Sequence, residues 1–256
     1  MGAIIQSDKE FWKRLTKMDW LSYLVAGAMV YVAVAIFILG MTYKVYQWLR
    51  APKTHIKTGV FPKPGNAAER WGQVVIDSFT FPQAMKADRT IWVFTILFHF
   101  ALLGAFVGHL RLIQEFTFLV NLLGSKGMDQ VSLWGGGVMG ILLMVTLTYY
   151  LFRRLYSPYK EISVPEDYIL LFLLIIVVVM GNHMRFLGKV HTADYRIYLQ
   201  SLLAFKPAFP KVLADSSTKW SLVVHVLFAN LLLIYFPFSK LVHVIATFPA
   251  NLARRV

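Results

Sequence analysis

Long apolar runs separated by shorter polar stretches dominate the hydrophobic pattern of this chain. A helix needs about 20 consecutive, mainly apolar residues to cross a hydrocarbon core of about 30 Å. Five runs are long enough, and they cover Trp20–Trp48, Ile91–Ile113 with apolar continuation to Leu123, Val131–Phe152, Tyr168–Phe186 and Trp220–Phe248. The alternation in runs of about ten residues that is typical of a transmembrane β-barrel is missing. The pattern therefore predicts an all-α, polytopic membrane protein folded as a five-transmembrane-helix bundle.

Two polar segments separate some of these runs. An inner loop over residues 49–90 contains several prolines and predicts a short helix over Ala67–Ser78. An outer loop over residues 187–218 is rich in polar and aromatic residues. Ser163-Val-Pro-Glu166 precedes the fourth run and predicts a capping box at the start of that helix. There are no repeats, so we expect a single domain over residues 1–256, and the polar first twenty residues predict no cleavable signal peptide.

Composition narrows the chemistry. The chain is 57% hydrophobic and only 15% charged, which is too apolar for an ordinary soluble domain. It contains no cysteine, which excludes disulfides, cysteine-ligated iron–sulfur clusters, c-type haem attachment and thiol catalysis. The net charge of +13 indicates contact with membrane lipid headgroups, and we expect no nucleic-acid partner.

Basic residues in the loops give the predicted orientation. They are nearly balanced between the two sides, but compact clusters lie at the end of the first run (Lys44, Arg50) and after the third run (Arg153, Arg154). Because positive charge near span ends favours the cytoplasm, we expect the N-terminus outside and the C-terminus in the cytoplasm.

Histidines within the apolar runs are the main candidates for function. Of seven histidines, His99 and His109 lie in the second run and His225 and His243 in the fifth, whereas His55, His183 and His191 lie in loops or near a span end. Ionisable residues inside a membrane are rare and usually functional. A lone histidine could instead be a hydrogen-bond donor between helices, but two on each of two helices are harder to explain in that way.

The spacing of these histidines predicts two pairs. His225 and His243 are 18 residues apart, so on one continuous helix they share a face at about 27 Å separation. His99 and His109 are 10 residues apart, which corresponds to about 15 Å and an offset of about 80° that requires a tilt or local bulge. The second and fifth spans run antiparallel, so His109 should face His225 on the outer side and His99 should face His243 on the inner side.

Paired imidazoles without a nearby carboxylate suit bis-histidine b haems better than other metals. The sequence lacks the HExxH motif, the histidine boxes of membrane di-iron enzymes and any zinc-type cysteine and histidine spacing. Gly104 and Gly108 could let a flat macrocycle approach the helix, or they could form a helix-packing face. Trp134-Gly-Gly-Gly137 and Gly140 allow the same two interpretations. Arg111 could pair with haem propionates or extend its charge to the interface.

Several of these residues resemble a known family. Phe236-Pro-Phe-Ser-Lys-Leu-Val-His243, with His225 before it, closely resembles the last span of the gamma subunit of respiratory nitrate reductase. Phe98-His99 and Gly108-His109-Leu110 resemble its second span. Sharp identity is confined to these two spans, and the pattern is shared with membrane subunits of heterodisulfide reductase and of the sulfite-reduction-associated complexes.

This resemblance implies a dihaem cytochrome b in a respiratory complex. Such a subunit exchanges electrons with a quinone pool, or with methanophenazine in methanogens, and its partner is a cytoplasmic iron–sulfur subunit. By this resemblance His109 and His225 hold the outer haem, and His99 and His243 hold the inner haem. The chain departs from nitrate reductase in its longer inner loop, its additional His183 and His191, and the short sequence after the fifth span. These departures favour the heterodisulfide- or sulfite-related branch.

Quinol oxidation also needs a proton acceptor near the outer haem. The hypothesis from the sequence is that His191 with Asp194 takes the proton, while Lys189 or Arg185 polarises a quinone carbonyl. The alternative is a hydrated loop with incidental charges. For the whole chain, the rivals are a proton-coupled transporter that uses the histidines as a relay and a structural anchor for a soluble enzyme.

Overall fold

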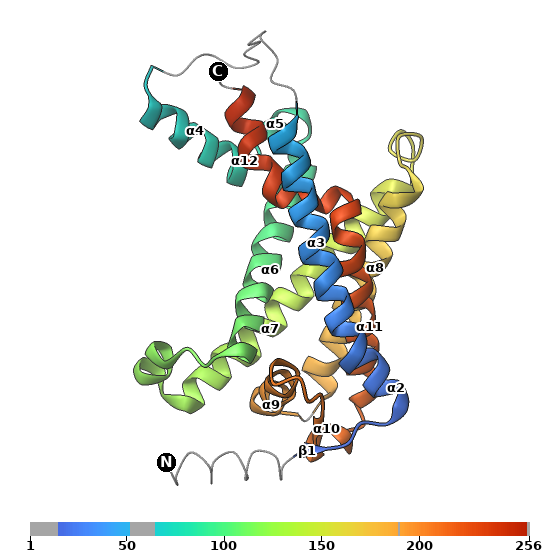
Figure 1. The fold of residues 1–256 in the computed structure, drawn as a ribbon. Coiled ribbons are helices and arrows are strands. Elements are labelled where there is room, and N and C mark those ends of the chain that lie inside the picture. The colour runs from blue at the N-terminus through green and yellow to red at the C-terminus, as the bar shows by residue number, and fades with distance from the viewer. Residues whose placement is uncertain (1–14, 52–64, 189, 255–256) are drawn as a thin grey trace.

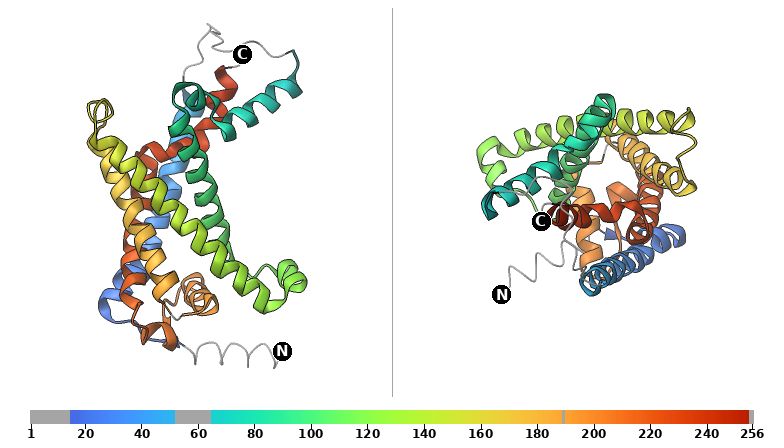
Figure 2. Two further views of the ribbon diagram at one scale, coloured as in Figure 1. Left: turned by 180° about the vertical axis from the view of Figure 1, so that it is seen from behind. Right: turned by 90° about the horizontal axis from the view of Figure 1, so that it is seen from above.

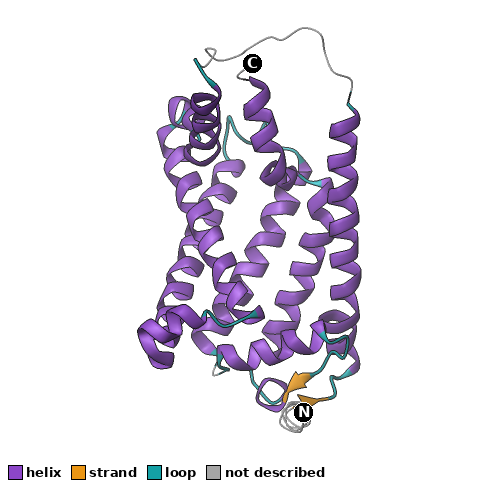
Figure 3. Cartoon of the chain, turned by 60° about the vertical axis from the view of Figure 1, so that its left-hand side comes forward, coloured by secondary structure: helices purple, strands orange, loops and turns teal. Residues whose placement is uncertain are grey.

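Five membrane-crossing helices form the body of the protein. A computed structural model describes residues 15–51, 65–188 and 190–254. Within these residues, five helices are long and apolar enough to cross a membrane: Trp20–Arg50, Arg89–Ile113, Thr117–Leu155, Pro165–Leu187 and Lys219–Phe238. Shorter helices lie at both ends of the bundle (Figure 1, Figure 3). The expected five-helix, all-α membrane fold is confirmed.

The spans pack in a defined order. α6 (Arg89–Ile113) packs against α7 (Thr117–Leu155), α7 against α8 (Pro165–Leu187), α8 against α11 (Lys219–Tyr235), and α11 against α3 (Met29–Arg50). Figure 2 shows this arrangement from behind and from above. In this order, the second span (α6) and the fifth span (α11) are not packed neighbours.

Glycines allow α7 and α8 to approach closely. A Cβ added to Gly140 would overlap the Oδ1 atom of Asn182, whose Nδ2 donates to the Gly140 carbonyl at 3.0 Å. A Cβ on Gly136 would lie 2.9 Å from the guanidinium of Arg185. These contacts support the helix-packing interpretation of Gly136 and Gly140.

The first span begins with an irregular segment. α2 (Trp20–Tyr23) leads into a π-helical turn, η1 (Leu24–Ala28), before α3 begins. A π-turn displaces backbone carbonyls from the regular helical bonding pattern. The Val25 carbonyl accepts a hydrogen bond from Asn230 Nδ2 at 3.0 Å, and the Ala26 carbonyl accepts one from Tyr198 Oη at 2.6 Å. The irregularity thus ties the first span to the fifth span and to the outer segment.

The third span is longer than the sequence predicts. α7 begins at Thr117 and contains one non-helical residue, Gly124, with φ 70°. The second span ends at Ile113, as the sequence predicts, and the apolar stretch that continues to Leu123 lies in the first part of α7. Glycine tolerates this backbone conformation without steric cost.

The fifth span is interrupted, which contradicts the continuous helix expected over Trp220–Phe248. α11 ends at Tyr235 and is followed by two 3₁₀ turns, η2 (Phe236–Phe238) and η3 (Lys240–Val242), before α12 (His243–Arg254). Pro237 has no backbone N–H to continue the helix, and the Ser239 hydroxyl caps the second turn by accepting from the Leu241 N–H at 3.1 Å. A Cβ on Gly40 of α3 would lie 2.7 Å from Pro237, so this interruption packs tightly against the first span.

Short helices cover the end of the bundle next to α12, which is called the inner end after the orientation expected from the sequence. α4 (Ala67–Thr80) begins where the sequence predicts and ends two residues later, and α5 (Pro82–Ala87) follows it. α4 packs against α12: Asn251 Nδ2 donates to Ser78 Oγ at 3.0 Å, and Arg70 donates to the Leu252 carbonyl at 3.0 Å.

The start of α8 differs from the predicted capping box. The N-cap residue is Val164, not Ser163, and the Asp167 carboxylate accepts from the Val164 N–H at 3.3 Å. Asp167 is buried and also forms ion pairs with Arg154 at 2.9 Å and Lys240 at 2.6 Å. A buried carboxylate needs such partners, so Asp167 joins the inner ends of α7 and α8 to the turn before α12.

The outer segment is folded, which contradicts its interpretation as a hydrated loop. It forms α9 (Thr192–Leu203), β2 (Phe209–Pro210) and α10 (Lys211–Ala214), and β2 pairs antiparallel with β1 (Leu15–Thr16). Its apolar side chains join a buried cluster with the first and fifth spans, made of Ala26, Tyr198, Leu202, Phe209, Leu213 and Leu222. This packing fixes α9 against the outer end of the bundle.

Candidate functional site

The outer predicted histidines lie close together with parallel rings. The imidazole rings of His109 on α6 and His225 on α11 have centres 6.4 Å apart and planes that differ by 3°. His109 Nδ1 lies 2.7 Å from the Ala105 carbonyl, and His225 Nδ1 lies 2.8 Å from the Val177 carbonyl on α8. An Nδ1–H that donates to a carbonyl fixes the tautomer and leaves Nε2 with its lone pair.

The inner predicted histidines also meet. The rings of His99 and His243 have centres 6.1 Å apart, and their planes differ by 77°. His99 Nδ1 lies 2.8 Å from the Thr95 carbonyl, and His243 Nδ1 lies 2.9 Å from the Lys240 carbonyl. All four histidines therefore share one bonding pattern, with Nδ1 committed to the backbone and Nε2 left for a ligand.

The ring separations fit a metal held between each pair. Two metal–nitrogen bonds of about 2 Å, with roughly 1.1 Å from each nitrogen to its ring centre, place ring centres about 6.2 Å apart. The observed values, 6.4 and 6.1 Å, lie on either side of this figure. Among the described residues, no group of three or more His, Cys, Asp or Glu side chains could hold a metal ion. Each pair supplies two ligands, which is the number that a b haem takes from the protein.

The inner pair forms for a different reason from the one expected. His225 and His243 do not share a face of one helix, because α11 ends at Tyr235 and His243 begins α12. α6 runs from Arg89 to Ile113 as an uninterrupted α-helix, so of the two alternatives for the offset between His99 and His109, the local bulge is absent and helix tilt remains. The interruption in the fifth span brings His243 opposite His99 instead. The two pairs also differ in the angle between their ring planes, which is 77° for the inner pair and 3° for the outer pair.

Aromatic residues of the inner end surround His99. Phe81 adopts a left-handed backbone conformation, with φ 48°, that turns the chain from α4 into α5, and its ring centre lies 4.9 Å from that of His99. Trp92 Nε1 donates to the Thr80 carbonyl at 2.6 Å, which fixes this turn against α6. The sequence did not reveal Phe81 as a neighbour of His99, because no local pattern predicts that a phenylalanine adopts the left-handed backbone conformation.

The two glycines between the histidines of α6 differ in their surroundings. A Cβ on Gly104 would lie 2.7 Å from Met139 Sδ on α7, which supports a packing role for this residue. A Cβ on Gly108 would meet nothing within 4 Å, so its role beside a cofactor stays a prediction. Gly181 on α8 was not singled out from the sequence, yet a Cβ there would lie 3.4 Å from the His225 ring.

Arg111 does not extend to the interface, because its side chain is buried and only 5% of the residue is exposed. Its guanidinium pairs with Glu115 at 2.6 Å and with Asp129 on α7 at 2.7 Å. Arg196 of α9 donates to the Arg111 carbonyl at 3.0 Å and also pairs with Glu115. The cation is therefore engaged by protein carboxylates, and the four residues join α6, α7 and α9. Its pairing with haem propionates stays a prediction.

A cavity of about 400 Å³ lies beside this ion cluster at the outer end. Its lining comes from the end of α6, the segment after it, α7 and α9, and its charged and ionisable members are Arg111, Glu115, Asp129, His191 and Asp194. The two arginines hold the pKa of the Glu115 carboxyl below its usual range, with the Arg111 hydrogen bond as the largest cause. Three residues that the sequence selected thus line one cavity.

The other predicted residues of the quinol site lie elsewhere. Arg185 packs against Gly136 in the α7–α8 contact and is not among the residues that line this cavity. Lys189 lies outside the described residues. His183 Nδ1 lies 2.8 Å from Ser221 Oγ, and its ring packs on Trp220 at 4.9 Å.

Comparison with known proteins shows the family of this chain. The model of the nitrate reductase gamma subunit family matches residues 80–256, which is more than half of the chain. The chain belongs to the nitrate reductase gamma subunit family. The matched region contains both histidine pairs, the outer cavity and the interrupted fifth span.

Two archaeal members of similar sequence carry more specific names. The chain is 26% identical over 255 residues to the Hdr-like menaquinol oxidoreductase cytochrome b-like subunit of Archaeoglobus profundus, covering 84% of this chain and 74% of that protein. It is 28% identical over 245 residues to the protein of the same name from Archaeoglobus fulgidus, covering 83% and 74%. These likenesses confirm the expected similarity to the heterodisulfide-reductase-related branch of the family.

Proposed function

We propose that this chain, over residues 1–256, is the membrane cytochrome b subunit of a quinol-oxidising respiratory complex. In this proposal His109 and His225 hold an outer b haem, and His99 and His243 hold an inner one. The observation that carries it is the meeting of four imidazoles in two pairs, three of them in membrane spans and His243 just beyond the fifth span, each with Nδ1 bonded to a backbone carbonyl. Bound there, a b haem would supply one-electron oxidation and reduction.

The protein tunes these ligands through their hydrogen bonds. A carbonyl that accepts from Nδ1 increases the basicity of the imidazole and keeps its ring in a ligating orientation. The outer pair takes its two carbonyls from α6 and α8, whereas the inner pair takes them from α6 and η3. Lys240 is itself held by buried Asp167, so the position of His243 depends on this ion pair.

The outer cavity is the proposed quinol site. Oxidation of a quinol to a quinone releases two electrons and two protons, so an acceptor for protons must lie beside the electron acceptor. His191 and Asp194 line the cavity and can take protons, while the arginine-bound carboxylates keep the site polar. The relatives are named as menaquinol oxidoreductase subunits, which favours menaquinol over methanophenazine as the substrate.

The proposed orientation places the N-terminus outside and the C-terminus in the cytoplasm. The outer cavity and α9 then face the exterior, and α4, α5 and α12 face the cytoplasm. A cytoplasmic iron–sulfur subunit would exchange electrons with the inner haem, since His99 and His243 lie at that end. Electrons that move inward while protons leave outside contribute to a membrane potential.

Reduction by quinol tests this proposal. A reduced menaquinone analogue is added without oxygen to the protein in liposomes, and the α band of reduced b haem is recorded. We expect the band to develop with the analogue and to be absent in the His109→Ala/His225→Ala variant. A wild-type protein whose haems are reduced by dithionite but never by the quinol would contradict the assignment.

A further inference from the structure

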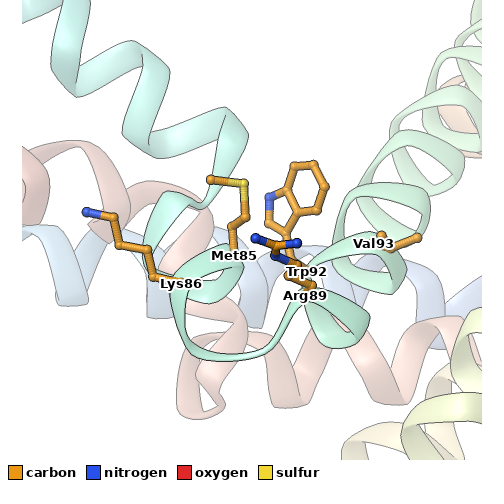
Figure 4. Close-up of a pocket in the computed structure, with 5 residues that line it drawn as sticks. All are labelled: Met85, Lys86, Arg89, Trp92 and Val93. Atoms are coloured by element: carbon orange, nitrogen blue, oxygen red, sulfur yellow. The ribbon is translucent and has the colours of Figure 1, made fainter.

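A second cavity lies at the inner end of α6, far along that helix from the outer cavity. It has a volume of about 440 Å³ and is lined by Met85 and Lys86 of α5 and by Arg89, Trp92 and Val93 of α6. Figure 4 shows Met85, Arg89 and Trp92 gathered at the α5–α6 turn, with Val93 on the same helix and Lys86 extending from α5. None of these residues takes part in the histidine pairs.

The charge of this cavity is positive and is not balanced by the surrounding protein. Within the described part of the chain, neither Lys86 nor Arg89 forms an ion pair or a side-chain hydrogen bond. The nearest carboxylate in sequence, Asp88, is committed elsewhere. It caps α6 by accepting from the Thr90 N–H at 2.8 Å, and it pairs with Arg153 at 3.6 Å. The site therefore has two cations available for an anion.

The remaining lining is apolar and continues into the membrane. Arg89 is the first residue of the second span, and Val93 lies one turn deeper. Val93 is exposed on the outside of that span, and Trp92 is fixed there by its hydrogen bond to the Thr80 carbonyl. A molecule that contacts both Arg89 and Val93 must have an anionic head at the interface and an apolar part in the bilayer.

The neighbouring helix α4 has the same character. Val74 and Ser78 are buried, and Ser78 bonds to Asn251 of α12, whereas Trp71, Val75 and Ile76 are exposed. A helix that turns large apolar side chains outward beside a membrane span is suited to the headgroup boundary. α4 therefore indicates that lipid, rather than water, borders this end of α6.

We propose that the α5–α6 cavity binds an anionic phospholipid, with the phosphate at Lys86 and Arg89 and the acyl chains along Trp92 and Val93. Basic pockets at the ends of membrane helices bind such headgroups, and each cation near an anionic surface strengthens binding about fivefold. A docked protein in the cytoplasm would reach Lys86 but not the lipid-facing Val93. The site does not rest on the presence of haem or on the identity of the quinol.

Native mass spectrometry of the detergent-solubilised holoprotein tests this site. The protein is titrated with phosphatidylglycerol and, separately, with phosphatidylcholine. We expect one retained phosphatidylglycerol of higher affinity, which is weakened roughly 30-fold in the Lys86→Gln/Arg89→Gln variant. The matched control is Arg50→Gln/Lys160→Gln, which removes two exposed cations from the same end of the bundle but outside the cavity, and it should bind as the wild type does.

Two further measurements separate the alternatives. The charge-preserving Lys86→Arg/Arg89→Lys variant should retain the lipid, and excess inorganic phosphate should not displace it, because free phosphate has no acyl chain. Equal weakening in the control variant, or unchanged binding in Lys86→Gln/Arg89→Gln, would overturn the proposal. So would displacement by phosphate. A Lys86→Gln/Arg89→Gln protein that kept the lipid but lost the copurifying subunits of its complex would assign the cavity to a protein interface instead.

Discussion

The imidazole rings of His109 and His225 lie parallel to within 3°, with centres 6.4 Å apart. They come from α6 and α11, which are not neighbours in the packing order of the bundle, and α8 supplies the carbonyl that orients His225. Three spans therefore determine one pair. This relationship makes the outer pair sensitive to changes on any of the three helices.

Replacing one ligand should remove one haem. We expect His225→Ala to lose the outer haem and retain the inner one, so that haem content falls to about half of the wild-type value. Pyridine haemochrome on the purified protein measures this. The matched control is His183→Ala on α8, whose ring bonds to Ser221 and pairs with no other histidine. Loss of the same amount of haem in the His183→Ala control, or full haem content in His225→Ala, would contradict the assignment.

The contact between α7 and α8 should not tolerate a methyl group at Gly140. A Cβ there overlaps Asn182 Oδ1, so we expect Gly140→Ala to destabilise the protein by about 1–3 kcal/mol. Gly135→Ala is the control, because a Cβ at Gly135 meets nothing within 4 Å, and alanine favours the helix. Thermal unfolding in detergent compares the two. Equal midpoints for the two variants would show that the close approach is not required.

Acid should loosen the outer ion cluster. Arg111 and Arg196 hold the pKa of Glu115 below its usual range. A carboxyl with a lowered pKa in the folded state stabilises the protein above its unfolded-state pKa, and this contribution is lost as the pH falls. We expect the unfolding midpoint of the wild type to fall more steeply between about pH 5 and pH 3 than that of Glu115→Gln. If the unfolding midpoints of the wild type and of Glu115→Gln fell equally with pH, Glu115 would not be the group whose protonation loosens the cluster.

His191 should control the rate of reduction by quinol. As a proton acceptor in the outer cavity it would contribute about 100-fold or more to that rate. Stopped-flow recording of the b-haem α band with a menaquinol analogue measures the loss in His191→Ala. Thr192→Ala, which changes an uncharged residue lining the same cavity, should remain close to the wild type. Normal quinol-to-haem transfer in His191→Ala would end the hypothesis.

The sequence was sufficient for the spans and for the residues that meet in pairs. Apolar length alone located five helices, and antiparallel order alone brought His109 to His225 and His99 to His243. Apolar length did not reveal the interruption of the fifth span, because the run is long enough to cross a membrane with Pro237 and Ser239 inside it. The proline itself was a local signal that the helix ends or kinks. The spacing of His225 and His243 thus predicted the two pairs that the structure shows, but it assumed one continuous helix, and that assumption was wrong.

Tertiary contacts explain the remaining differences. The ion pair between Arg111 and Glu115 could have been predicted from the sequence, because an arginine and a glutamate four residues apart on a helix commonly pair. Asp129 joins them through the packing of α7 on α6, in a helix that contains the non-helical Gly124, and no local pattern predicts that contact. In the outer segment, Tyr198 and Leu202 are four residues apart and could have indicated a packed helix.

The haem content of the wild-type protein tests the central claim most directly. The protein is purified from membranes, its reduced-minus-oxidised spectrum is recorded, and pyridine haemochrome gives the haem-to-chain ratio. Two bis-histidine sites predict a b-type α band and about two b haems per chain. A colourless protein, or one that binds no more than a single haem when haem is supplied in excess, would contradict the account.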